Sequence, residues 1–150
     1  MIQRIQSVYL LVVTILLIVC MCTPVGAYIA EDYSVSKFTN LCIVSADGVK
    51  DYAPWAMFVI LVVAALLSFT TIFMFKKRML QIRMTIFSTI LLVGYYATLI
   101  TFIFMLKDDS MTFSASWTLC LPFAAIILNW LAIRAIGKDE VLVKAYDRLR

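Results

Sequence analysis

The stretch that decides the fold is residues 54–75, PWAMFVILVVAALLSFTTIFMF, which carries no charged side chain and is followed at once by Lys76-Lys77-Arg78. As an α-helix it would extend over about 30 Å, the thickness of the hydrocarbon core of a bilayer. Pro54 suits the first turn of a helix, and Trp55 is an aromatic residue of the kind found among lipid headgroups. The stretch therefore predicts a membrane-spanning helix that ends at a basic cluster.

Three further apolar runs have the same character, at residues 5–23, 84–106 and 116–136. Hydrophobic residues make up 64% of the 150-residue chain and its mean hydropathy is +1.00, whereas charged residues (15%) are confined to short blocks between the runs. So short a chain cannot bury this much apolar surface from water. The sequence therefore predicts an all-α membrane protein, a single domain whose four spanning helices form a bundle. Pro122 is expected to bend the fourth helix.

The first apolar run has an alternative interpretation as a cleaved signal peptide. Arg4 precedes the run, and the small residues around Val25-Gly26-Ala27 resemble a cleavage site. The run is longer than the apolar core of a typical signal peptide, and it ends at a proline as a retained helix can. We therefore expect the first helix to stay in the protein.

Basic residues are divided unequally between the two ends of the predicted bundle. Ten of the 13 lysines and arginines lie on the side of both termini, and three lie on the other side, namely Lys37, Lys50 and Lys107. Because lysine and arginine are retained in the cytoplasm, both termini are predicted to be cytoplasmic. The basic residues at the ends of the spans are expected to anchor the protein to anionic lipid headgroups on that side: Arg4, Lys76, Lys77, Arg78, Arg83 and Arg134.

Residues 28–53 form a hydrophilic segment that is predicted to be a solvent-exposed loop on the other side of the membrane. Within it, Leu41-Cys42-Ile43-Val44 is rich in residues that favour strands and leads to Asp47-Gly48, a dipeptide typical of type I′ turns. A small hairpin is therefore predicted here.

The C-terminal residues 137–150 are predicted to form a short amphipathic helix after a break at Gly137, which would cap the fourth span. Leu142, Tyr146 and Leu149 recur at helical spacing and give this helix an apolar stripe. A helix so short is marginal alone in water. We therefore expect these three side chains to dock on a partner or on the bundle, rather than on lipid alone.

The residues of catalysis and metal binding are scarce in this chain. Histidine is absent, and the Cys20-x-Cys22 pair lacks a second cysteine pair at metal-ligand spacing. The sequence therefore predicts no catalytic residue, no metal site and no cofactor, and it argues against an enzyme. Cys22 and Cys42 are both expected on the non-cytoplasmic side, where an oxidising compartment would permit a disulfide. The alternative, given equal weight, is that Cys22 and Cys42 are free thiols that serve only as small packing residues.

Small and weakly polar side chains at helical spacing predict where the spans touch one another. Asn129 shares a face of the fourth helix with Ala125 and Ala132, Ala64 and Ser68 form a similar stripe on the second, and Thr98 lies on the third. Small residues let helices approach closely, and the Asn129 amide is expected to hydrogen-bond to a neighbouring helix for about 1 kcal/mol. The alternative role for Asn129 is as a ligand for a substrate or ion.

Three blocks of the sequence match a known pattern in order and position: residues 1–10 (MIQRIQSVYL), 75–83 (FKKRMLQIR), and 129–140 (NWLAIRAIGKDE) with 147–150 (DRLR). On these blocks the chain resembles a family of small four-helix inner-membrane proteins of the Bacteroidota, classed as a domain of unknown function, DUF4293. The resemblance spans nearly the whole chain. It implies a location in the bacterial inner membrane and no particular activity.

Two hypotheses for function follow. The first is a non-enzymatic accessory or scaffold subunit that packs against a larger inner-membrane assembly, because the spans carry polar stripes suited to helix association and no acidic or lysine side chain. The second is a small transporter or channel component that works as an oligomer, with Asn129 and the threonines and tyrosines of the third helix lining its path. The expected partners are the bilayer and either another membrane protein or further copies of the chain, and no nucleic acid.

Overall fold

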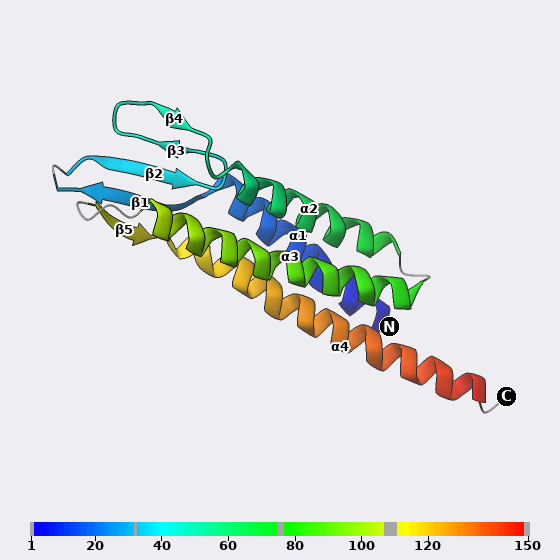
Figure 1. Cartoon of the computed structure of the whole chain (residues 1–150). Coiled ribbons are helices and arrows are strands. Elements are labelled where there is room, and N and C mark those ends of the chain that lie inside the picture. Colours follow the sequence, from blue (N-terminus) through cyan, green and yellow to red (C-terminus); the bar gives the residue numbers. More distant parts are fainter. Residues whose placement is uncertain (1, 32, 75–76, 107–110, 149–150) are drawn as a thin grey trace.

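The computed structural model describes residues 2–31, 33–74, 77–106 and 111–148, with the backbone alone for a few residues at the two ends. It has four long helices side by side and a small antiparallel sheet at one end of them (Figure 1). The helices are α1 (Ile2–Cys22), α2 (Trp55–Phe73), α3 (Arg78–Met105) and α4 (Cys120–Arg148), and a 3₁₀ turn, η1 (Trp117–Leu119), precedes α4.

The predicted four-helix membrane architecture is confirmed in its helical part. Each of the four helices is long and apolar enough to cross a membrane, and between 22% and 33% of each candidate span is buried inside the protein. Because the remaining surface includes many large apolar side chains on all four helices, it suits lipid rather than water. The chain therefore forms a multi-pass membrane protein.

The helices follow one another around the bundle, since α1 packs on α2 and α4, and α3 packs on α2 and α4. Both described chain ends lie at the end of the bundle opposite the sheet (Figure 1). Leu10, Val13 and Leu17 of α1 are fully buried against the other helices. The first helix thus supplies part of the core, and its retention in the protein stays a prediction.

The third span begins earlier than the predicted residue 84. Helix α3 starts at Arg78, so residues 79–83 are helical and not a connection. Gln81 and Thr85 in these first turns are buried, which gives the segment a packed face and keeps it helical. Pro122 is the third residue of α4, where the missing N–H would have no helical partner. The bend predicted for it is therefore not required.

The break predicted at Gly137 is wrong, because α4 continues through it as one helix to Arg148. Glycine inside a helix costs about 1 kcal/mol relative to alanine, which tertiary contacts on either side can offset. A Cβ atom added at Gly137 would meet nothing within 4 Å, so the glycine does not serve close packing. The predicted separate tail helix is instead the last part of α4.

Nearly half of the predicted loop over residues 28–53 is strand, so the fold is not all-α as predicted. The sheet has the order β4-β3-β2-β1-β5, and all its pairs are antiparallel. Its strands are β1 (Pro24–Ala30), β2 (Val35–Thr39), β3 (Ile43–Val44), β4 (Lys50–Asp51) and β5 (Met111–Ala115). Strand β5 comes from the connection between α3 and α4, so the sheet unites both connections at this end of the bundle (Figure 1).

The predicted hairpin is confirmed as β3 and β4, but its turn is not type I′. A type I′ turn needs positive φ at both central residues, whereas in this hairpin only Gly48 has it, at 78°. The Gly48 N–H donates to the carbonyl oxygen of Ser45 at 2.9 Å, and the Ser45 N–H donates to that of Val49 at 3.0 Å. The connection is therefore a longer loop in which Gly48 takes the left-handed conformation.

One face of the sheet carries an aromatic cluster of Tyr28, Phe38 and Phe113. The ring centroids of Tyr28 lie 5.8 Å from Phe38 and 5.0 Å from Phe113. A Cβ at Gly26 would lie 2.6 Å from the Phe113 ring and 2.7 Å from a backbone oxygen, so this position requires glycine. The cluster is part of the main core, which makes the sheet one body with the helices.

Asn40 ties the sheet to two helices. Its side-chain N–H donates to the carbonyl oxygen of Cys20 in α1 at 2.7 Å, and its side-chain oxygen accepts from the Tyr95 hydroxyl of α3 at 2.7 Å. All three residues are buried. Because unsatisfied polar groups are costly in a protein interior, this satisfied network fixes where the sheet sits on the bundle.

Candidate functional site

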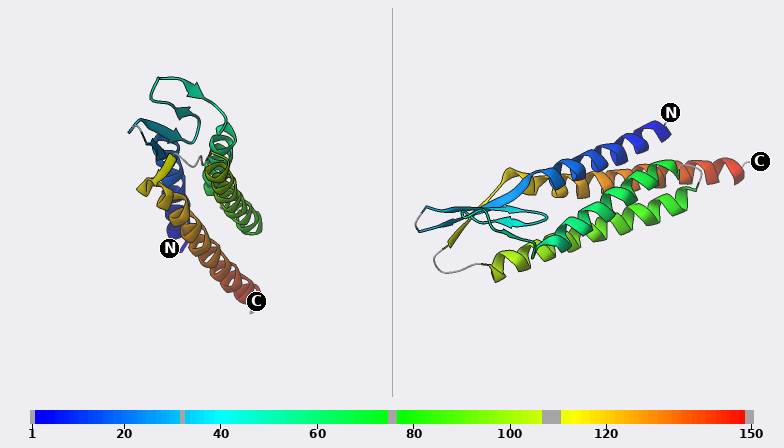
Figure 2. Two further views of the ribbon diagram at one scale, coloured as in Figure 1. Left: turned by 60° about the vertical axis from the view of Figure 1, so that its left-hand side comes forward. Right: turned by 90° about the horizontal axis from the view of Figure 1, so that it is seen from above.

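The end of α4 projects beyond the rest of the bundle, past the ends of α1, α2 and α3 (Figure 1, Figure 2). A helix of 29 residues is about 43 Å long, whereas a hydrocarbon core is about 30 Å thick. The last turns of α4 therefore lie outside a membrane that covers the bundle.

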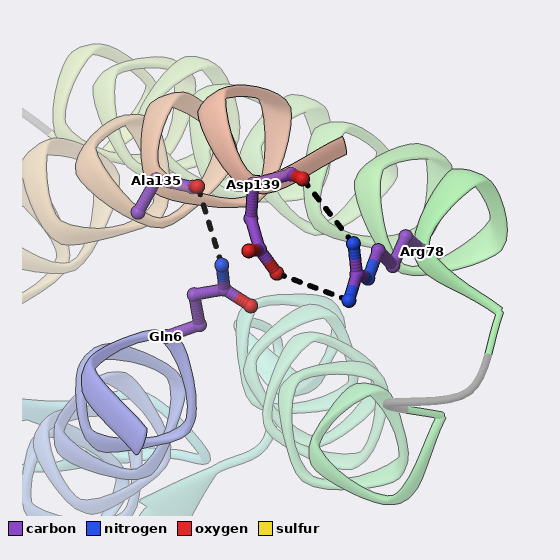
Figure 3. Close-up of polar contacts among 4 residues, drawn as sticks. All are labelled: Gln6, Arg78, Ala135 and Asp139. Carbon is purple, nitrogen blue, oxygen red and sulfur yellow. Dashed lines mark hydrogen bonds and ion pairs between the residues drawn. The ribbon is translucent and has the colours of Figure 1, made fainter. Parts of the chain in front are cut away.

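An ion pair holds α4 at the point where it leaves the bundle (Figure 3). Arg78, the first residue of α3, places Nη2 3.3 Å from Asp139 Oδ2, and its Nη1 donates to the Asp139 carbonyl oxygen at 3.2 Å. The two side chains are 24% and 14% exposed. The contact to Asp139 Oδ2 lacks hydrogen-bond geometry, so this buried oxygen is held by charge attraction.

Gln6 of α1 holds the same part of α4 from another side. Its side-chain N–H donates to the carbonyl oxygen of Ala135, one turn before Asp139, at 3.2 Å. Gln6 is buried although it is polar. Figure 3 shows that Gln6 and Arg78 approach α4 from different helices. We call the contacts of Gln6 and Arg78 with Ala135 and Asp139 the α4 clamp.

Beyond the α4 clamp, three consecutive apolar side chains are uncovered: Val141 is 67% exposed, Leu142 51% and Val143 42%. Val141 and Leu142 line a shallow depression of about 530 Å³ together with Arg134, Gly137 and Lys138. The missing side chain at Gly137 leaves room for an apolar group there. A rigid helix with this surface is suited to contact a further molecule.

The three tail residues predicted to dock are placed as follows. Leu142 is 51% exposed, so the bundle leaves about half of it uncovered, and its docking on a partner stays a prediction. It is exposed because α4 runs straight on and carries Leu142 away from the other helices. The side chain of Tyr146, and Leu149 as a whole, lie outside the described residues.

The predicted helix-contact residues are mostly buried. Asn129, Ala125, Ala132 and Ala64 have no exposed surface, and Ser68 lies 3.3 Å from Ser88 of α3, hydroxyl to hydroxyl. Thr98 is half-buried and donates to the Gly94 carbonyl oxygen of its own helix.

The interhelical hydrogen bond expected of Asn129 is not formed. Neither its side-chain nitrogen nor its oxygen has a hydrogen-bond partner among the described residues, although the residue is fully buried. The helices around it offer close packing rather than a polar partner. Such an amide costs about 1–3 kcal/mol relative to a satisfied one.

The predicted lipid anchors divide into two groups. Lys77, Arg83 and Arg134 are exposed, and the Arg134 guanidinium lies 5.7 Å from the centroid of the Trp130 ring. Arg78 instead turns to Asp139. The Arg4 side chain and Lys76 lie outside the described residues.

The cysteines are free thiols, so Cys22 and Cys42 are not bonded in this structure. Over the described ranges, no group of three or more histidine, cysteine, aspartate or glutamate side chains is arranged to hold a metal ion.

Sequence reasoning missed Gln6 and Asp139. Gln6 lies in the first turns of an apolar helix, and Asp139 was assigned to the short amphipathic helix predicted after Gly137. The available signal was spacing, since Asp139 lies three residues from Ile136 and seven from Ala132, on the buried face of α4.

Comparison with known proteins gives one family. The model described as Domain of unknown function (DUF4293) matches residues 2–149. No curated protein matches the chain.

Proposed function

The chain belongs to the DUF4293 family, for which no function is known, and from that premise we propose that it is a non-enzymatic accessory or scaffold subunit of an assembly in the bacterial inner membrane. The observation that carries the proposal is the uncovered apolar surface at the end of α4, held rigidly by the α4 clamp. A rigid element loses little conformational entropy when it binds.

The orientation belongs to the same proposal. Both termini are in the cytoplasm and the sheet faces the periplasm, because most lysines and arginines lie at the end of the bundle with the termini. The end of α4 then projects into the cytoplasm, where Val141 and Leu142, which line the depression, would meet water in an isolated subunit. Coverage by a partner would remove this apolar surface from water.

The partner is a different membrane protein with an apolar helix flanked by acidic residues. Arg134 and Lys138 are the charged residues that line the depression, so an acidic partner complements it. A second copy in the same orientation would bring the same two positive charges together, which opposes pairing.

A photo-crosslinking amino acid at Val141 tests the proposal in native membranes. We expect one discrete adduct, heavier than the chain and different from twice its mass. Val143 is the matched control, because it is exposed on the same turn but does not line the depression. An adduct of two copies, or equal adducts from both positions, would contradict a specific partner of another kind.

A second candidate function is a transporter or channel component, and the orphan amide of Asn129 is the observation that favours it. A buried polar group without a partner at membrane depth is costly, so it is usually kept for a function.

The Asn129→Leu substitution tests this candidate, because it removes the amide and keeps the branched shape of the side chain. If Asn129 serves only in packing, the Asn129→Leu variant should melt at the same temperature as the parent or at a higher one. Cells that carry the variant should then behave like cells that carry the parent protein. Loss of solute flux in liposomes would instead support transport.

A further inference from the structure

The α4 clamp lies where α4 loses contact with the rest of the bundle. Ile136 is fully buried and Asp139 is 14% exposed, whereas the described side chains from Val141 onward are exposed. After Asp139 the helix continues through residues 140–148, about 13 Å at 1.5 Å per residue. The direction of this end is therefore set by the contacts that α4 makes up to the clamp.

The two contacts of the α4 clamp come from different helices and meet α4 at successive turns. Gln6 of α1 donates to the Ala135 carbonyl oxygen, and Arg78 of α3 reaches Asp139, one turn further along (Figure 3). A helix held by contacts to two neighbours keeps one direction, whereas a helix held from one side can tilt about that contact. Arg78 therefore fixes α4 relative to α3 at this end of the bundle.

Arg78 lies at a position where its own helix would favour a negative charge. It is the first residue of α3, and the first turn of α3 has no acidic residue. The dipole of a helix disfavours a positive charge at its N-terminus. The carboxylate and the carbonyl oxygen of Asp139 compensate for this, so Arg78 serves the contact with α4 and not its own helix.

The clamp holds α4 from a different side than the depression that is proposed to receive the partner. Successive residues of an α-helix are about 100° apart around its axis. Asp139 is therefore about 140° from Arg134 and about 160° from Val141, two residues that line the depression. The lining of the depression does not include Arg78. Arg78 can thus act on partner binding through the direction of α4 without touching the partner.

The direction of α4 matters because the proposed partner lies in the same bilayer. The groups of a binding surface need to be held within about 10–20° of the productive geometry. A partner that is itself oriented by the membrane meets the depression over such a narrow range of α4 directions. If α4 pivoted over a wider range, it would be competent for a fraction of the time, and the observed affinity would fall by that fraction.

From this geometry we propose that Arg78 is the positioning residue of the surface at the end of α4: it fixes the direction of α4 through Asp139 and so sets the affinity for the partner. The inference rests on the function proposed for this surface. It adds that a contact on the other side of α4, between α3 and α4, controls the surface.

Distances between spin labels in the purified full chain, measured by pulsed electron paramagnetic resonance, test the position of α4 without a partner. The native cysteines are replaced by alanine, and labels are attached at Phe73→Cys and Val143→Cys, both at exposed positions. The parent should give one narrow distance distribution. Arg78→Gln should broaden or shift it by about 3 Å, the displacement of residue 143 when α4 tilts by about 15° around Ala135.

Three further measurements separate this effect from a general loosening of the bundle. A label pair at Ile5→Cys and Phe73→Cys, which leaves α4 out, should keep its distance in Arg78→Gln. Arg78→Lys retains a positive charge near Asp139 and should keep the narrow distribution. Arg83→Gln removes an exposed arginine of the same helix and should behave like the parent.

The photo-crosslink at Val141 in native membranes then measures the effect on the partner. Arg78→Gln should lower the yield of the partner adduct about fivefold, the result expected if α4 keeps the competent direction for about one fifth of the time. Leu99→Ala is the matched control for lost stability, because it opens a cavity in the buried core at the other end of α3. Its adduct yield should equal that of the parent.

The outcomes distinguish this inference from the function on which it rests. Unchanged distances in Arg78→Gln, or a loss of adduct shared with Leu99→Ala, would overturn the role of Arg78 while the parent adduct still upheld the partner. A displaced α4 with an unchanged adduct yield would overturn it as well. No adduct from the parent would overturn the proposed function, and with it any role of Arg78 towards a partner.

Discussion

Arg78 and Asp139 place opposite charges at the point where α3 begins and α4 leaves the bundle. Neither residue stood out in the sequence, because Arg78 belongs to a basic cluster typical of lipid anchors and Asp139 to a charged tail. A pair between residues 61 positions apart cannot be inferred from local spacing. The buried small residues Ala64, Ala125 and Ala132, by contrast, are where their spacing predicted helix contact.

The first prediction concerns this ion pair. Replacing Arg78→Gln leaves the Asp139 carboxylate largely buried without a counter-charge, which should lower the stability by about 1–3 kcal/mol. Adding Asp139→Asn removes that charge, so the double variant should recover part of the loss. Thermal unfolding in detergent of the two single variants and the double variant measures the coupling. Strictly additive losses would show that the pair contributes nothing.

At the scale of elements, the four spans could be predicted and the sheet largely could not. Apolar runs of membrane length are local signals, and each one became a helix. Strand β1 instead pairs with β5, more than 80 positions away, and its residues PVGAYIA look like the end of an apolar span. Such a pairing is decided by tertiary packing, here by the aromatic cluster around Tyr28. The local β3–β4 hairpin was predictable from its turn residues.

The second prediction tests the continuity of α4. In a continuous helix, Gly137→Ala should stabilise the protein by up to about 1 kcal/mol, because the added Cβ meets nothing within 4 Å. At a capping glycine with positive φ the same change would be destabilising. Gly48→Ala is the control, since Gly48 does have a φ of 78° and should lose stability. A melting temperature below that of the parent for both variants would indicate a break at Gly137.

At the scale of the whole molecule, the two ends of the bundle have different surfaces. One end carries the sheet, and the other carries both chain ends, most of the basic residues and the projecting end of α4. The account of function depends on which end faces the cytoplasm. The partner that we propose at the end of α4 would have to be reached from the cytoplasm.

Labelling of single cysteines with a membrane-impermeant maleimide, in cells whose outer membrane is permeabilised and whose inner membrane is intact, tests this orientation most directly. The four native cysteines are first replaced by alanine, and Val49→Cys on the β3–β4 loop is compared with Lys77→Cys before α3, both at exposed positions. We predict that Val49→Cys is labelled in intact inner membranes with the outer membrane permeabilised, and that Lys77→Cys is labelled only after the inner membrane is opened. Labelling of Lys77→Cys in the closed membrane, with Val49→Cys protected, would contradict the account.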